Sequence, residues 1–598
     1  MLKLKFRYVI LLLFVLLVIG CRQAEVAPIE IAAQPATRRP TMTATIRPSS
    51  TPTATATNTP TPTLTPSPTP TPTATAVSIQ IQSELPDLDT NEAEPVVGAP
   101  CGLVDTLDFP IEPPLALNVS RGGQDFGVFR NRYSKYHAGE DWGAPSGRRN
   151  LGEPVYGIGN GRVMYAAPNG WGRDKGVVII EHSLLDGDHV LSFYGHLDPP
   201  SVILRAGDCI KRGDQVGNIG DPRTSPHLHF EMRTHMPYQP GPGYWEEDPT
   251  TVGWIPPSQT IWQQRMLAQP NVDWIRPYTN TSKPIDMLNE ASMLLLASRT
   301  VMNVNLNDGS IQDSVLPEEN IIDVLLIPQQ NRLYSVNQQG ELMQWMQTQE
   351  GFAAEWSTEL SKRGRTTLHR APNGGAIVAI QNVLFHVNKD GELLWQFELE
   401  ERPSYWANTA EQTIFAIDNP PSLWRIKGED LPEQIAEVTG IPLLNDTTLQ
   451  VYAQNAVYHV EADMAVSAYP LPNGFLQFGD ATSLTNGRFL IAHTDIFDQR
   501  LLAFAADGTL LWQRSYAELF PDDVQLLSLN DQPYFVTRKT TGVTTILDIY
   551  EIDMETAVLT HIFTGGTRTT FSRNNWITPV NDGFMLSIND DLVRLLSE

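Results

Sequence analysis

Ser225-Pro226-His227-Leu228-His229-Phe230-Glu231 is the most informative stretch of this 598-residue chain. As a β-strand it places His227, His229 and Glu231 on one face, because successive side chains of a strand point to opposite sides. The other face carries Leu228, Phe230 and Met232 and is apolar enough to join a core. Neutral imidazole is a common zinc ligand, so the paired histidines indicate a metal site if further ligands exist elsewhere in the chain.

Two earlier segments offer such groups. His137-Ala138-Gly139-Glu140-Asp141 holds a histidine and a carboxylate, which can bind zinc at roughly 2.0–2.2 Å. In Val190–Asp198, an extended backbone would put Tyr194 and His196 on one face, opposite Phe193 and Leu197. Short strands separated by glycine turns predict an antiparallel sheet here.

These motifs, in this order and spacing, resemble the LytM/lysostaphin-type zinc metallopeptidases over roughly residues 120–250. The resemblance implies a β-rich scaffold of the duplicated-hybrid-motif type with one Zn²⁺ per chain. It implies that His137, Asp141 and His229 bind the metal and that His196 and His227 act on water and substrate. The implied substrates and partners are the peptides of cell-wall peptidoglycan.

The chemistry of this set is consistent with hydrolysis. Three protein ligands leave a fourth tetrahedral position for water, whose pKa zinc lowers toward about 7. Two unliganded imidazoles nearby can move protons. Glu231 can orient an imidazole, although a strand-end salt bridge is an equally good explanation, and Tyr194 is a weaker candidate for a supporting role. The alternative function is a non-catalytic envelope scaffold or regulator whose peptidase-like domain binds wall peptides. The complete set of five residues favours the enzyme.

The N-terminus has the features of an export signal. A basic head precedes the apolar run Val9–Ile19, which is too short for a comfortable membrane span and fits a signal-peptide core. Val18-Ile19-Gly20-Cys21 resembles a bacterial lipoprotein lipobox, which implies that Cys21 carries lipid. An uncleaved signal anchor is the alternative. Both interpretations predict an exported, membrane-anchored protein facing the cell envelope or exterior.

Composition adds three expectations. The Thr/Pro-rich residues 22–99 cannot form a core and predict a disordered stalk or plain linker. The net charge of −26 argues against nucleic-acid binding. If Cys21 is lipidated, Cys101 and Cys209 remain, and an even pair in an exported protein suggests a disulfide, with two free thiols as the alternative.

The C-terminal half repeats a β-run, a polar turn and an ending such as Gly391-Glu-Leu-Leu-Trp395 or Gly508-Thr-Leu-Leu-Trp512. This pattern resembles the quinoprotein-like β-propellers, and its length predicts about six to eight blades. Quinone-dependent dehydrogenase activity is rejected, because the adjacent cysteine pair common in those enzymes is absent. The propeller is expected to bind a protein partner, or to serve as a spacer.

The sequence therefore predicts a mainly β protein with two folded parts. The expected divisions are a signal peptide (1–21), a stalk (22–99), a LytM-like peptidase domain (100–258), a linker (259–285) and a propeller (286–598).

Overall fold

The computed structural model describes most of the chain from Ala99 onward. The described residues are 99–234, 241, 243–278, 282–312, 314–317, 320–349, 351–409, 411–444, 449–453, 455–461, 464–471, 479–494, 498–569 and 575–597. Cys21 and residues 22–98 of the expected stalk lie outside them. Within the described ranges, none of the helices combines the length and the hydropathy that crossing a membrane requires.

The prediction of a mainly β chain is confirmed, and the first part is built on one large sheet. Its central strands follow the order β10-β7-β8-β9-β12-β5-β2, with β1 beside β8 and β14 beside β12. The strands of this sheet are β1 (Leu103–Val104), β2 (Val119–Arg121), β5 (Glu140–Pro145), β7 (Gly161–Ala167), β8 (Gly176–Leu184), β9 (His189–Leu197), β10 (Cys209–Ile210), β12 (Leu228–Arg233) and β14 (Trp254–Ile255).

Two small sheets and several short helices complete this part. They comprise β3 (Phe129–Arg130), β4 (Lys135–His137) and β13 (Tyr244–Trp245) in one sheet, β6 (Pro154–Tyr156) and β11 (Gln215–Asn218) in the other, and the 3₁₀ turns η1 (Gly172–Asp174), η2 (Pro199–Ser201) and η3 (Pro249–Val252).

Strand β12 lies in the middle of the large sheet, as its alternating sequence predicts. It pairs antiparallel with β9 on one side and with β5 on the other. Leu228, Phe230 and Met232 are fully buried in the main hydrophobic core, so the apolar face of the strand is the core face. His229 and Glu231 consequently point to the opposite face.

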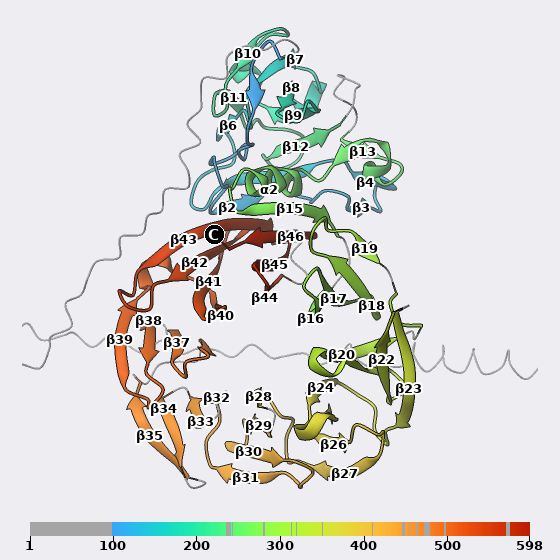
Figure 1. Ribbon diagram of the computed structural model, residues 1–598. Helices are drawn as coiled ribbons and strands as arrows, with labels where there is room; N and C mark the ends of the chain where they lie inside the picture. The colour runs from blue at the N-terminus through green and yellow to red at the C-terminus, as the bar shows by residue number, and fades with distance from the viewer. Residues whose placement is uncertain are drawn as a thin grey trace, which may run out of the picture. The chain divides into compact units, whose positions relative to one another are not determined.

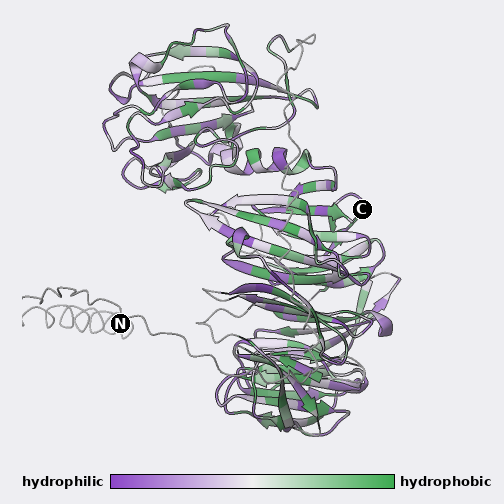
Figure 2. Cartoon of the chain, turned by 90° about the vertical axis from the view of Figure 1, so that its left-hand side faces the viewer, coloured by the Kyte–Doolittle hydropathy of each residue, from purple (hydrophilic) through white to green (hydrophobic). Residues whose placement is uncertain are grey.

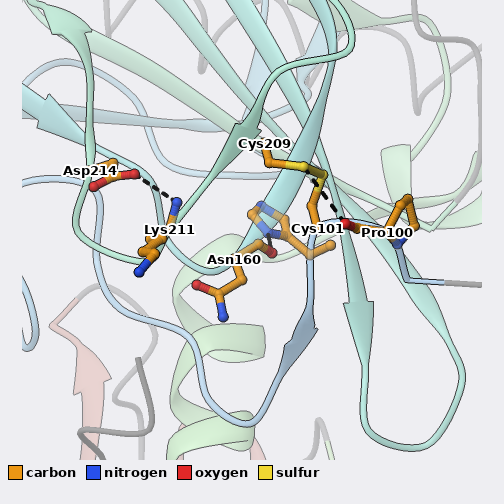
Figure 3. Close-up of a disulfide and its surroundings, with 7 residues drawn as sticks. Pro100, Cys101, Asn160, Cys209, Lys211 and Asp214 are labelled. Atoms are coloured by element: carbon orange, nitrogen blue, oxygen red, sulfur yellow. Dashed lines mark hydrogen bonds between the residues drawn. A yellow bond between two sulfur atoms is a disulfide. The ribbon is translucent and has the colours of Figure 1, made fainter. Parts of the chain in front are cut away.

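A disulfide joins Cys101 to Cys209 across 108 residues of sequence, with their Cα atoms 5.2 Å apart (Figure 3). Cys209 begins β10, at the edge of the large sheet, and Cys101 lies just before β1. The bond therefore ties the start of the described chain to the sheet edge.

The segment 259–285, for which the sequence predicts a linker, contains regular structure. Helix α2 (Pro257–Leu267) begins with proline at its first position, where the missing N–H costs no helical bond. Strand β15 (Val272–Pro277) follows and pairs antiparallel with β46 (Asp591–Leu596) near the C-terminus. Pro257 begins α2 and Pro277 ends β15, so these prolines mark the ends of elements rather than an extended connector.

The second part is a propeller of eight four-stranded sheets in the described part of the chain, the upper end of the predicted range. Figure 1 shows the sheets arranged as a ring, with strands such as β16, β24, β28, β40 and β44 toward the centre. The last sheet has the order β15-β46-β45-β44, so a strand from before the propeller repeats completes the final blade. Strand β44 (Trp576–Val580) lies beside both β40 (Asp523–Leu529) and β16 (Ser282–Asn289), which closes the ring.

The blades are antiparallel meanders in which hydrophobic and hydrophilic residues interleave (Figure 2). The first four consist of β16 to β19 (Ser282–Asn289, Ser292–Ala297, Thr300–Asn305, Ile311–Gln312), β20 to β23 (Ile321–Ile327, Arg332–Asn337, Glu341–Thr348, Gly351–Glu359), β24 to β27 (Thr366–Arg370, Ala376–Ile380, Val383–Val387, Leu393–Glu398) and β28 to β31 (Trp406–Asn408, Gln412–Ile417, Ser422–Lys427, Glu433–Ala436).

The remaining blades follow the same plan. They consist of β32 to β35 (Ile441–Leu444, Leu449–Tyr452, Ala456–Glu461, Met464–Pro470), β36 to β39 (Asp480–Ser483, Phe489–Thr494, Gln499–Phe504, Leu510–Ser515), β40 to β43 (Asp523–Leu529, Gln532–Thr541, Thr544–Ile552, Leu559–Arg568) and β44 to β46 with β15, where β45 is Gly583–Ile588. The 3₁₀ turns between or within them are η4 (Pro328–Gln330), η5 (Pro372–Gly374) and η6 (Ala517–Leu519).

One hydrophobic core spans the first part, helix α2 and the last two blades. It contains Trp142 from β5, Trp262 from α2 and Phe563 from β43, all at most 1% exposed. Burying apolar area between elements is the main favourable term in folding, so this continuity attaches the propeller firmly to the first part.

Candidate metal centre and the residues around it

The antiparallel register of β12 and β5 places Asp141 directly opposite His229. His137, the last residue of β4, lies nearby because β4 leads into β5 across only two residues. Three residues that the sequence predicts as metal ligands are thus brought together by strand pairing. Their three donor atoms lie within 4.8 Å of one another, and all three residues are buried.

The distances within this group suit a small cation. His137 Nε2 lies 3.0 Å from His229 Nδ1, and Asp141 Oδ1 lies 3.3 Å from each of those nitrogens. Tetrahedral zinc with bonds of about 2.0–2.2 Å separates its ligand atoms by roughly 3.3–3.6 Å, close to what the three residues offer.

The other ring nitrogens fix the histidine tautomers. His137 Nδ1 lies 3.1 Å from the carbonyl oxygen of Asp125 and must donate, because a carbonyl oxygen only accepts. His229 Nε2 lies 2.8 Å from Glu231 Oε1 and donates to that carboxylate. In the neutral rings, His137 Nε2 and His229 Nδ1 therefore present lone pairs to each other and to Asp141. Such an arrangement is stable only with a cation or a proton between them.

Asp141 divides its two oxygens between different partners. Oδ2 accepts a hydrogen bond of 2.7 Å from the backbone N–H of Gln124, and Oδ1 faces the imidazoles. The loop can approach this closely because Gly123 lacks a Cβ, which would collide with the Asp141 carboxylate. One oxygen is thus left for a metal.

Glu231 is fully buried and holds three groups at once. Besides His229, it accepts hydrogen bonds from Arg233 Nε at 2.9 Å and from Trp254 Nε1 at 2.7 Å. Glu231 therefore contacts both an arginine and an imidazole, in a buried position within β12.

The pKa values reflect these contacts. Burial opposes ionisation of Asp141, but the charge and hydrogen bond of His137, with bonds to the other two imidazoles, hold its pKa well below the usual range. Burial likewise opposes ionisation of Glu231, but Arg233 and His229 lower its pKa to about 2. For His229, burial is outweighed by Asp141 and Glu231, which raise the pKa to about 9. At neutral pH this ring therefore holds a cation or a second proton.

His196 and His227 lie beside the three candidate ligands, with ring centroids 4.7 Å apart. The Nδ1–H of His196 donates to the Asp174 carbonyl at 2.8 Å, and that of His227 donates to the Ser225 carbonyl at 2.7 Å. Their Nε2 atoms are therefore proton acceptors in the neutral rings, and His227 Nε2 lies 3.4 Å from Asp141 Oδ1. Burial, then the charges of His229 and His227, lower the pKa of His196 to about 3, so its ring is neutral at pH 7.

The structure contradicts the predicted common face of Tyr194 and His196. Tyr194 lies in the main hydrophobic core, and its hydroxyl bonds the backbone N–H of Ile158 and Ser192 Oγ. His196 instead has a φ of 63°, a left-handed conformation that breaks the two-residue alternation of the strand. This twist brings His196 to the side of Phe193, so Tyr194 does not support the imidazoles directly.

Two aromatic residues near the histidines were not singled out by the sequence. The Trp171 ring centroid lies 5.0 Å from that of His196 and 5.4 Å from that of His229. The Tyr244 ring lies 5.1 Å from that of His137, opposite which it pairs in β13. Neither stands in a motif with a histidine, so no local pattern could have identified them.

The first part of the chain is similar in sequence to known proteins. Residues 135–240 match the model of peptidase family M23. Over 83 residues, the chain is 36% identical to lipoprotein NlpD of Yersinia enterocolitica, a stretch that makes up 14% of this chain and 78% of that protein. Over 167 residues it is 27% identical to lysostaphin of Staphylococcus simulans, which amounts to 24% of this chain and 31% of lysostaphin. The chain thus spans about a third of the length of lysostaphin.

Solved structures align with about half of the chain. BamB from Moraxella catarrhalis is 13% identical with a TM-score of 0.35 and covers 54% of this chain and 100% of its own. Sqt1 from Chaetomium thermophilum is 7% identical with a TM-score of 0.43, covering 55% and 99%. The identity with NlpD over most of that protein, together with the matching family model, shows that the chain belongs to peptidase family M23.

Proposed function

We propose that this protein is a zinc-dependent endopeptidase that hydrolyses peptide bonds in cell-wall peptidoglycan. The observation that carries the proposal is the convergence of His137 Nε2, Asp141 Oδ1 and His229 Nδ1, with two further imidazoles beside them. Membership of a peptidase family and similarity to lysostaphin support the choice of reaction.

The donor set fits zinc. Two imidazole nitrogens and one carboxylate oxygen are ligands that zinc accepts, and three protein ligands are typical of catalytic rather than structural sites. His137, Asp141 and His229 would hold the ion, and Glu231 would keep the His229 ring in the orientation that aims Nδ1 at it. When bound, the ion supplies Lewis-acid chemistry, acidifying water and polarising a carbonyl group.

His196 and His227 move protons in this proposal. Their Nδ1–H groups are engaged by backbone carbonyls, so each Nε2 can accept a proton from the attacking water. The imidazolium so formed can pass that proton to the amine that leaves when the peptide bond breaks. Trp171 packs against both His196 and His229 and keeps the rings from rotating away.

We place the enzyme outside the cytoplasm, attached to a membrane through lipid on Cys21. The disulfide between Cys101 and Cys209 supports export, because such bonds persist mainly in oxidising compartments. The lipoprotein relative NlpD supports an envelope location. Residues 22–99 would then give the peptidase reach from the membrane, and the propeller would offer a platform for a protein partner.

The proposal is tested by replacing the two proton-transfer residues singly. His196→Ala and His227→Ala should each retain about one zinc per chain but digest purified peptidoglycan roughly 10²-fold more slowly. Asp141→Ala should instead lose tightly bound zinc, because an anionic ligand is removed. His189→Ala, on the same strand as His196 but exposed, is the matched control and should digest normally.

Zinc content is measured by elemental analysis and digestion by release of soluble peptides. Normal turnover in both histidine variants would exclude the proton-transfer roles. Stoichiometric zinc in Asp141→Ala after mild chelation would exclude the ligand set. A wild-type protein that binds zinc and wall material but releases no peptide would favour the non-catalytic scaffold.

A further inference from the structure

Arg568 is the last residue of β43, in the propeller, yet its partners lie in the peptidase domain. Its side chain is 1% exposed. The Nε–H donates to Asp125 Oδ1 at 2.8 Å, and Nη2 donates to the backbone carbonyl of Asp141 at 3.1 Å. The guanidinium carbon lies 4.4 Å from the centroid of the Trp142 ring.

Both hydrogen-bonded residues act directly on candidate metal ligands. The backbone carbonyl of Asp125 accepts the hydrogen bond that fixes the His137 ring, and Asp141 is itself a candidate ligand. Arg568 therefore bonds the backbone of one candidate ligand, Asp141, and is linked to a second, His137, through Asp125. Its guanidinium lies over Trp142, whose ring belongs to the main hydrophobic core, so it reaches them from the core side of β5.

The charge of Arg568 is also needed where it lies. Asp125 is 7% exposed and Glu140, whose carboxylate is 3.7 Å from Arg568 Nη1, is 0% exposed. A buried carboxylate requires an opposite charge or hydrogen bonds. Arg121 also pairs with Asp125 at 3.2 Å, and Ser258 donates to Glu140, but among the described residues Arg568 alone pairs with both acids. A planar guanidinium can donate in two directions at once, which a lysine ammonium cannot reproduce with the same geometry.

The surrounding junction holds the end of β43 in place. Val543, in the turn before β42, donates its backbone N–H to the Val119 carbonyl at 3.0 Å, and Thr544 bonds the Ala116 carbonyl at 3.2 Å. Gly566, two residues before Arg568, lies so close to Trp262 of α2 that any Cβ would collide with the indole. Because Thr544 pairs with Arg568 between β42 and β43, these three contacts together hold the backbone around Arg568.

We propose that Arg568 is a positioning residue through which the propeller sets the geometry of the metal centre. The inference rests on the proposed zinc function. It assigns the propeller a role inside the peptidase: with Arg568 in place, Asp125 orients His137, and Asp141 keeps the backbone position that aims Oδ1 at the imidazoles. Loss of the contact leaves the ligands present but less well organised, so zinc binds more weakly.

The test uses the full chain with Arg568→Lys and Arg568→Met, and Arg594→Lys and Arg594→Met as matched controls. Arg594 is also a buried propeller arginine, 5% exposed, but it pairs with Asp273 and Asp582, which do not touch the metal centre. Zinc affinity is measured by competition with a chelator, and the visible spectrum of the cobalt-loaded protein reports ligand geometry. Circular dichroism and thermal melting establish that each variant is folded.

We expect Arg568→Met to bind zinc about 10–100-fold more weakly than wild type, the range seen when groups that orient metal ligands are removed. Arg568→Lys should be intermediate, the cobalt spectrum should change, and excess zinc should restore peptide release. The Arg594 variants should melt at lower temperature with unchanged zinc affinity and spectrum. Asp125→Asn should weaken zinc binding less when it is added to Arg568→Met than when it is made in the wild-type protein, because the two residues act through one contact.

Wild-type zinc affinity and an unchanged cobalt spectrum in folded Arg568 variants would overturn the inference. So would equal losses of affinity in the Arg568 and Arg594 variants, which would reduce Arg568 to a general stabiliser. A wild-type protein that binds zinc but cuts nothing would refute the proposed peptidase, while the affinity measurements would still decide the role of Arg568.

Discussion

Asp141 shows how a single residue can be committed to three partners without losing its availability to a metal. Its Oδ2 is held by Gln124, its backbone carbonyl is held by Arg568, and its Oδ1 faces the imidazoles. The carboxylate therefore cannot rotate, and a rigid ligand binds metal without first losing conformational freedom.

Asp591 illustrates a different consequence of burial. Its Oδ1 accepts hydrogen bonds from Gln259 and Gln263 of α2, whereas Oδ2 has no hydrogen-bond partner among the described residues. Burial, against the two glutamine bonds, raises its pKa from an ordinary 3.8 to about 7. Between these values the folded protein keeps a proton that the unfolded chain releases, so the free energy of unfolding falls as pH rises through this window.

Asp591→Asn should remove this pH dependence, because an amide stays neutral at every pH. We expect the free energy of unfolding of the wild type, measured in urea, to decline from pH 4 to pH 7 relative to the variant. The relative change should be on the order of 1 kcal/mol for each unit of pH within that window. Parallel curves for the two proteins across this range would contradict the raised pKa.

At the scale of elements, β15 connects the ends of the propeller. It lies between α2 and the first blade in sequence but pairs with β46, whose outer edge would otherwise be free. An uncovered strand edge exposes backbone N–H and C=O groups and invites association with other chains. We therefore propose that the propeller domain begins with β15, upstream of the boundary at 286 that the sequence suggests.

A fragment of residues 270–598 should accordingly be more stable than one of residues 282–598, which begins at the first residue of β16. Both lack the peptidase domain and α2 and so expose the same blade surfaces, which makes them a matched pair. The longer fragment retains β15, including the nearly buried Trp274 and Ile275, and should melt about 5 °C higher or more. Equal melting temperatures and equal tendencies to aggregate would mean that the final blade does not need this strand.

The sequence predicted which side chains share a face where two-residue alternation governs the backbone. The alternation of β12 identified both the core face and the face of His229 and Glu231, and strand pairing then placed Asp141 opposite. The prediction that Tyr194 and His196 share a face was wrong, because the positive φ of His196 interrupts the alternation. A histidine side chain gives no indication of such a backbone conformation.

The sequence could not reveal contacts that depend on how distant segments fold together. Arg568 is 427 residues from Asp141 in the chain, and neither residue belongs to a sequence motif that includes the other. The repeated blade pattern similarly predicted a propeller and an approximate number of blades. It did not indicate that β15 would complete the last one, because pairing partners far apart in sequence leave no local signal.

At the scale of the whole molecule, the peptidase domain and the propeller share one hydrophobic core and a buried set of charges. A peptidase fragment of residues 100–258 would lack Arg568 and all but the first two residues of α2. Zinc binding and activity are therefore best measured on the full chain, in which the surroundings of the metal ligands are complete.

Cleavage of cell-wall peptide bonds with a bound zinc ion is the function that we propose for this chain. Mass spectrometry of the soluble material released from purified peptidoglycan by the zinc-loaded full chain tests it most directly. We expect fragments with new peptide amino and carboxyl ends on intact glycan strands, which are absent after chelation and restored by zinc. Cleaved glycan strands, or no release by a fully zinc-loaded wild-type protein, would contradict it.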